Sequence, residues 1–189
     1  MIASAQPLFC CSDIGTGYDP KDPTIADRWH SLLESGATLS FGSDWPCAWP
    51  PDPFQNIQQA VTRVIWHSDD TGDIAGLPID GAHQGGSTPT GKIYAAAERI
   101  GVQEAVDAYT RSAAYAMFAE DRVGVLQVGK AADLVVLSQD IFKVPAEQIG
   151  QTHALMTLVG GTIVFDAAAP NETEPRQLRA PASQAVARF

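Results

Sequence analysis

Residues 37–53 read ATLSFGSDWPCAWPPDP, and this stretch decides how the fold is interpreted. The first five residues, ATLSF, predict a short strand, which runs directly into Gly42, Ser43 and Asp44. Four prolines among residues 45–53 then exclude regular secondary structure, because proline lacks a backbone donor. The pattern therefore predicts a strand that ends in a rigid loop with an acidic residue at its start.

The sequence on the amino-terminal side predicts a neighbour for this strand. Residues 2–6 are apolar and precede Pro7, which favours a second short strand. A helix is predicted over 24–35, with Thr24 as its N-cap and Gly36 at its C′ position. This strand, helix, strand order is typical of a parallel α/β sheet, because parallel neighbours need a crossover.

The remaining elements are predicted from periodicity and turn residues. Helices are expected over 54–64, with Asp52 near the amino end, and over 91–100 and 102–118, with a long glycine-rich loop at 67–91. Beyond Asp121 the period changes to that of strands, Gly129-Lys130 predicts a turn, and residues 133–137 predict a strand. Residues 155–165 predict a β-hairpin around Gly160-Gly161, and residues 167–189 predict a disordered tail.

Composition and charge exclude several classes of function. The chain has 189 residues with 12 Lys and Arg against 22 Asp and Glu, a net charge of −10 that opposes nucleic-acid binding. We expect no membrane span and no signal peptide, because no apolar run is long enough for either. Three cysteines without a C-x-x-C pair favour buried thiols in a reducing compartment, and we expect the cytoplasm.

Asp44 is the strongest candidate for chemistry, because α/β folds place catalytic groups at the carboxyl ends of their strands. The alternative is that Asp44 only caps the next turn. The aromatic and proline residues after it, beginning with Trp45, favour a pocket wall. The four histidines lack metal-ligand spacing. His67 and His83 lie in or beside the long loop, where they contact either substrate or solvent. His30 lies in a predicted helix and is expected to be a surface or a satisfied side chain.

Three blocks of sequence carry a family resemblance: SFGSDWPCAWPPDPFQNIQQAVTR at 40–63, EAVDAYTRSAAYAMFAEDRVGVLQVGKAADLVVLSQDIF at 104–142 and LMTLVGGTIVFD at 155–166. Their order and spacing resemble the carboxyl-terminal part of the amidohydrolase superfamily, in particular the amidohydrolase-3 branch. The resemblance covers residues 2–166. It implies a metal-dependent hydrolase of carbon–nitrogen bonds other than peptide bonds.

The resemblance also implies an architecture. Residues 1–120 are expected to be the last strands and helices of a TIM barrel, residues 121–166 part of a composite β-sandwich, and residues 167–189 a tail. Lys130 is then a structural turn residue.

The resemblance assigns the chemistry to one residue. Asp44 matches the family aspartate after the eighth barrel strand, which binds a divalent metal, expected to be Zn²⁺, and accepts a proton from the water bound to it. Trp45, His67 and His83 are the expected substrate contacts, and the substrate is a small molecule.

The family's H-x-H motif, its lysine or glutamate and two further histidines are absent from the chain and are expected upstream of residue 1. Phe9 stands where the branch often has a histidine. Two interpretations follow. The chain is either the carboxyl-terminal portion of a hydrolase, inactive alone, or a non-catalytic α/β domain that oligomerises and binds a partner or a small ligand.

Overall fold

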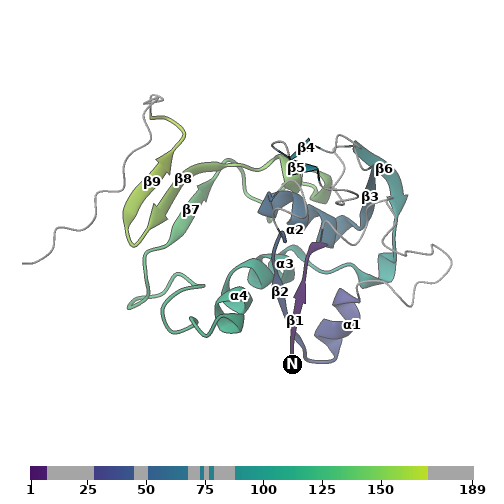
Figure 1. Cartoon of the computed structure of the whole chain (residues 1–189), viewed down its shortest axis with the longest axis horizontal. Coiled ribbons are helices and arrows are strands. Elements are labelled where there is room, and N and C mark those ends of the chain that lie inside the picture. Colours follow the sequence, from purple (N-terminus) through teal and green to yellow (C-terminus); the bar gives the residue numbers. More distant parts are fainter. Residues whose placement is uncertain (8–27, 45–50, 68–72, 75–76, 79–87, 170–189) are drawn as a thin grey trace, which may run out of the picture.

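The computed structural model describes residues 1–7, 28–44, 51–67, 73–74, 77–78 and 88–169 (Figure 1). It contains both helices and strands and has the α/β character that the sequence predicts. Among the described residues, no helix is both long and apolar enough to cross a membrane. The expectations for the three cysteines, Thr24, Phe9 and the tail from residue 170 onward lie outside the described residues.

The first two strands form the predicted parallel pair. β1 (Ile2–Ala5) and β2 (Thr38–Phe41) pair in register, with Ala3 opposite Leu39 and Ala5 opposite Phe41. Ala5, Leu39 and Phe41 are buried, whereas Ser4 on the other face of the pair is exposed. One face of the pair is therefore packed under helices, and the other carries Ile2 and small polar side chains.

Helix α1 (Trp29–Glu34) lies within the predicted helix and ends as expected. Gly36 has φ +80°, and its N–H donates to Leu33 O while Ala37 N–H donates to Leu32 O. These two bonds form a Schellman motif, which requires a left-handed residue and so favours glycine.

Helix α2 (Pro53–Thr62) confirms the helix predicted after the proline-rich loop. The Asp52 carboxylate accepts a hydrogen bond of 2.8 Å from the Phe54 N–H, and Pro53 occupies the first helical turn, where no donor is needed. The helix stops two residues earlier than expected because Arg63 has the left-handed φ of 57°.

The prediction of one long loop over 67–91 is wrong for the described residues. β3 (Val64–His67) pairs antiparallel with β6 (Thr88–Ile93), and the two-residue strands β4 (Asp73–Ile74) and β5 (Leu77–Pro78) pair with each other.

The helix predicted over 91–100 is also wrong, because strand pairing with β3 takes residues up to Ile93. Ala95 is left-handed, and only the 3₁₀ helix η3 (Ala96–Glu98) forms. Pairing with a distant strand here overrides the local helix propensity of the alanines.

The helix predicted over 102–118 is present as two shorter helices, α3 (Val102–Tyr109) and α4 (Arg111–Ala116). They separate at Thr110, whose backbone angles of φ −118° and ψ −95° are not helical. The Thr110 hydroxyl donates to Val106 O at 2.8 Å, a local bond that competes with helix geometry.

The carboxyl-terminal sheet has three antiparallel strands, β7 (Leu134–Leu137), β8 (Ala154–Val159) and β9 (Thr162–Asp166), with the 3₁₀ helix η4 (Ala146–Gln151) between the first two. The predicted hairpin is confirmed, and both of its glycines have positive φ. The strand expected near Val123–Val128 is absent, and residues 120–130 form turns, bends and irregular backbone instead. Lys130 Nζ donates to Glu120 O within these turns, as a structural turn residue would.

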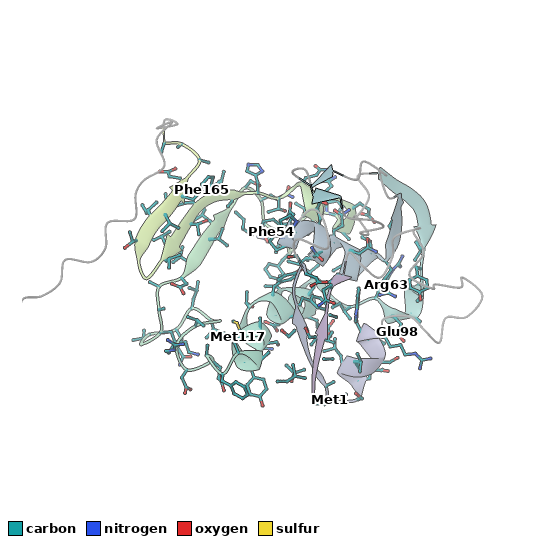
Figure 2. All side chains as sticks on the ribbon, in the orientation of Figure 1. Met1, Phe54, Arg63, Glu98, Met117 and Phe165 are labelled. Atoms are coloured by element: carbon teal, nitrogen blue, oxygen red, sulfur yellow. The ribbon has the colours of Figure 1, made fainter. Side chains whose placement is uncertain are left out.

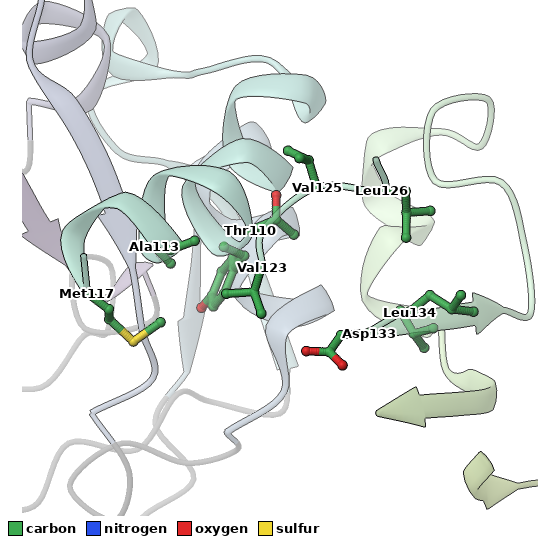
Figure 3. Close-up of a pocket in the computed structure, with 12 residues that line it drawn as sticks. Thr110, Ala113, Met117, Val123, Val125, Leu126, Asp133 and Leu134 are labelled. Carbon is green, nitrogen blue, oxygen red and sulfur yellow. The ribbon is translucent and has the colours of Figure 1, made fainter. Parts of the chain in front are cut away.

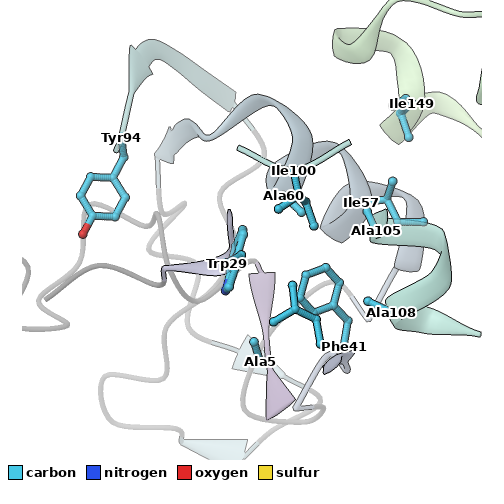
Figure 4. Packing of buried hydrophobic residues seen from close by; sticks show 11 residues of the cluster. Ala5, Trp29, Phe41, Ile57, Ala60, Tyr94, Ile100, Ala105, Ala108 and Ile149 are labelled. Atoms are coloured by element: carbon cyan, nitrogen blue, oxygen red, sulfur yellow. The ribbon is translucent and has the colours of Figure 1, made fainter. Parts of the chain in front are cut away.

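The core lies between the β1–β2 pair and helices α1, α2 and α3 (Figure 4). Trp29 is its largest buried side chain, and its ring meets the Phe41 ring edge-on at 5.5 Å. In Figure 1 the three-stranded sheet lies apart from this core, on the left. The core therefore supports the end of β2, where the candidate site lies.

Candidate functional site

The carboxyl end of β2 is held against β1. The Gly42 N–H donates to Ala5 O at 3.1 Å, which extends the parallel pair by one residue. Asp44 follows with φ 54° and an exposed side chain. Aspartate tolerates this left-handed conformation better than most residues. The structure thus places Asp44 just beyond the end of a parallel strand, as the sequence predicts.

Tyr109, at the end of α3, reaches the same place. Its hydroxyl donates to Gly42 O at 3.4 Å, and its ring packs edge-on against Phe41 with centroids 5.7 Å apart. Burial, together with the nearby negative charge of Asp52, raises the pKa of Tyr109 well above its ordinary value of 10.0. The hydroxyl therefore remains a hydrogen-bond donor at any physiological pH.

The structure separates the roles of the two aspartates near this loop. Asp52 caps α2 through its hydrogen bond from Phe54 N–H, whereas Asp44 ends its strand with an exposed carboxylate. Of these two residues, Asp44 is therefore the one whose carboxylate is exposed to solvent and is not used to cap α2.

Of the other predicted substrate contacts, His67 is the one whose main chain the structure describes. His67 is the last residue of β3, in a different sheet from β2, and its main chain pairs with Thr88. Trp45 and His83 lie outside the described residues. His30 is exposed on α1, with its Nε2 3.4 Å from a Glu34 carboxylate oxygen.

The described residues do not form a complete metal site. Among them, no group of three or more His, Cys, Asp and Glu side chains is arranged to hold a metal ion. The exposed carboxylate of Asp44 fits as one oxygen ligand, but one ligand is too few for a catalytic centre.

Arg63 is a buried residue that no pattern in the sequence predicts. Its side chain is fully buried, and its guanidinium lies 4.4 Å from the Trp29 ring centroid and 5.1 Å from that of Tyr94. Its Nε donates to Tyr94 O at 3.2 Å. A left-handed arginine at a helix end has no recognisable sequence pattern. Arg63, at the end of α2, thus contacts both α1, through Trp29, and the chain after β6, through Tyr94.

Glu98 fastens the same region from the surface (Figure 2). Its carboxylate accepts from Ser31 N at 3.0 Å and from Ser31 Oγ at 2.6 Å, so it satisfies an open N–H of the first turn of α1. Burial raises the pKa of Glu98, but the two Ser31 hydrogen bonds and the charges of Arg63 and His30 outweigh it and lower the pKa overall.

A groove of about 450 Å³ lies between α3–α4 and β7 (Figure 3). Its walls are mostly apolar, and Asp44 is not among the described residues that line it. The lining includes Tyr109, Thr110, Ala113, Met117, Val123 and Leu134. Tyr109 therefore borders the groove as well as the end of β2.

Comparison with known proteins identifies the family. The model of the amidohydrolase family Amidohydro_3 matches residues 2–165. The Bacillus subtilis (strain 168) protein named "Putative amidohydrolase YtcJ" is 30% identical over 164 residues, which are 85% of this chain and 27% of that protein. The Arabidopsis thaliana protein LONG AFTER FAR-RED 3 is 33% identical over 174 residues, 87% of this chain and 25% of that protein.

One solved structure is also similar, an amidohydrolase from Thermotoga maritima MSB8. It has a TM-score of 0.46 and 18% identity, over 72% of this chain and 25% of that one. This chain spans about a quarter of the length of the two relatives. The match of the family model covers nearly all of the chain outside the tail, and the chain therefore belongs to the amidohydrolase family.

Proposed function

We propose that this chain is the carboxyl-terminal portion of a metal-dependent hydrolase that cleaves carbon–nitrogen bonds other than peptide bonds. In this proposal Asp44 is a metal ligand and proton shuttle, the chain alone is inactive, and the substrate is a small molecule. The observation that carries it is the position of Asp44, exposed at the carboxyl end of a parallel strand in a member of a hydrolase family. Catalytic residues of α/β barrels occupy such strand ends.

Family membership also supports the cofactor, because amidohydrolases of this family generally use divalent metals. We propose Zn²⁺, with Asp44 giving one oxygen ligand and the other ligands coming from residues outside those described. When bound, such a metal lowers the pKa of a water to about 7. Asp44 then accepts the proton of the attacking water on a carboxylate oxygen and returns it to the leaving amine. Because the Asp44 side chain is exposed, its carboxylate oxygen is accessible to both the attacking water and the leaving amine.

The central experiment replaces Asp44 by Asn in the complete hydrolase. Asparagine also tolerates a left-handed backbone, so the turn is kept while the proton acceptor is lost. We expect turnover to fall to background with an unchanged circular dichroism spectrum. Asp121→Asn, at an exposed turn after α4, is the matched control and should keep full turnover. Unchanged turnover in Asp44→Asn would exclude the proposed role.

Two further observations test the proposal. Extending the reading frame upstream should reveal an H-x-H motif within a few hundred residues. The isolated chain, dialysed against Zn²⁺, should contain no stoichiometric metal by elemental analysis. Stoichiometric zinc would contradict the claim that Asp44 needs ligands from elsewhere.

A second function is favoured by the three-stranded sheet. Its cross-strand neighbours Val135, Thr157 and Phe165 share one face, and Val135 and Phe165 are 47% and 48% exposed. On the other face Leu158 pairs with Ile163, which is 45% exposed. Apolar surface of this kind is typical of an interface.

A non-catalytic domain that oligomerises through this sheet would cover the exposed side chains. Light scattering of the isolated chain distinguishes the two functions, because a discrete oligomer is expected only for the second. We further propose that the protein acts in the cytoplasm and binds neither nucleic acid nor membranes, on the grounds of its charge and its cysteine content.

A further inference from the structure

We propose that Tyr109 is a positioning residue for Asp44: by holding the Gly42 carbonyl, it fixes the turn in which the Asp44 carboxylate is presented. This inference rests on the proposed function for its catalytic consequence. Its structural part stands on the contacts around the end of β2.

Gly42 is held by hydrogen bonds on both sides of its backbone. Its N–H donates to Ala5 O at 3.1 Å, and its carbonyl accepts from the Tyr109 hydroxyl at 3.4 Å. The first bond belongs to the parallel pair of strands. The second comes from a different element, α3, and is made by a side chain.

The Tyr109 ring is itself held firmly. It packs edge-on against Phe41, which in turn packs edge-on against the buried Trp29. These contacts with the core orient the ring and its hydroxyl, although Tyr109 also borders the groove. The break between α3 and α4 falls directly after Tyr109, at Thr110.

The turn at Asp44 requires such support. The left-handed conformation costs most residues other than glycine roughly 1–2 kcal/mol, and aspartate, although it adopts it more readily than most, still incurs part of this cost. The net contribution of one hydrogen bond is about 0.5–1.5 kcal/mol, and this bond, longer at 3.4 Å than most O–H···O bonds, lies at the lower end of that range. Loss of the bond therefore shifts the conformational balance of the exposed Asp44 away from φ 54°.

The test variant is Tyr109→Phe, which keeps the ring and removes only the donor. Tyr115→Phe, on α4 with its side chain 48% exposed, is the matched control. In the isotope-labelled 189-residue chain, we expect the ¹³C shift of the Gly42 carbonyl to change and the left-handed population of Asp44, measured by its HN–Hα coupling, to fall about twofold. The control should change neither.

A purely structural role for Tyr109 predicts a different result. Since Phe keeps the packing against Phe41, the Gly42 shift and the Asp44 coupling would then match those of the wild type. That outcome overturns the inference whatever the activity of the protein.

Activity of the complete hydrolase gives the second readout. Misplacing a catalytic group by about 1 Å costs up to about 100-fold, so we expect Tyr109→Phe to lower kcat at least about tenfold with KM unchanged. If Asp44→Asn kept full turnover, the proposed function would fail, while the NMR result would still decide whether Tyr109 fixes the turn. If Asp44→Asn were inactive and Tyr109→Phe fully active, Tyr109 would not be a positioning residue for the reaction.

Discussion

Replacing Arg63 tests whether a single buried cation fastens the helices that support the candidate site. The guanidinium lies against two aromatic rings, and each such contact is worth about 1 kcal/mol or more when water is excluded. The Arg63 Nε–H also donates to Tyr94 O, and a hydrogen bond from a charged donor contributes about 1.5 kcal/mol. We therefore expect Arg63→Ala to lower the free energy of unfolding by at least about 3 kcal/mol.

The left-handed backbone at Arg63 provides an internal control. Alanine keeps the cost of φ 57°, whereas glycine does not, so Arg63→Gly should be about 1 kcal/mol more stable than Arg63→Ala. Arg63→Lys keeps the charge but not the flat guanidinium, and should fall between alanine and wild type.

Urea unfolding followed by circular dichroism measures these differences, provided that the m-value stays constant. An alanine variant within about 1 kcal/mol of the wild type would refute the assignment of Arg63 as a fastening residue. A glycine variant no more stable than the alanine variant would show that the left-handed backbone at position 63 does not destabilise the alanine variant.

The remaining predictions concern stability at two other points of the fold. Because folding lowers the pKa of Glu98, ionised Glu98 stabilises the folded state. This stabilisation is fully present above pH 4.5, the ordinary pKa of the group, and is lost as the pH falls through the lower pKa of the folded state. Glu98→Gln should lower the free energy of unfolding by about 1 kcal/mol at pH 7, as expected for a helix cap partly screened by solvent. The difference in melting temperature between Glu98→Gln and the wild type should vanish at acidic pH, and a difference that stays constant with pH would contradict this. Gly124 and Gly129 both have φ +94°, but an added Cβ meets Ala114 Cβ at 2.6 Å only at Gly124. Gly124→Ala should therefore be clearly less stable than Gly129→Ala in thermal unfolding, and equal melting temperatures would show that Gly124 is not closely packed.

Local patterns in the sequence determine the elements that need no distant partner. Gly36 ends α1, Asp52 and Pro53 start α2, and Gly160-Gly161 turns the hairpin, because caps and turns are fixed by residues a few positions apart. The parallel pairing of β1 and β2 is also predictable, since a helix between two short strands leaves few other arrangements. The position of Asp44 at a strand end follows directly from these elements.

Long-range contacts decide the rest, and the sequence does not display them. Residues 88–93 are strand because β3 pairs with them, although the adjacent alanines favour helix. Tyr109 is 67 residues from Gly42, and Glu98 is 67 residues from Ser31, so neither contact leaves a local pattern.

The sequence by itself thus determined the family, the α/β class and the exposed aspartate at the end of a strand. Only the tertiary structure decided which side chains hold that strand end in place and which apolar faces stay open. The physical reason is that a cap or turn is stabilised by residues a few positions apart. The burial of Arg63, the hydrogen bond from Tyr109 to the Gly42 carbonyl and the pairing of β3 with β6 stabilise the fold only when segments distant in the sequence come together.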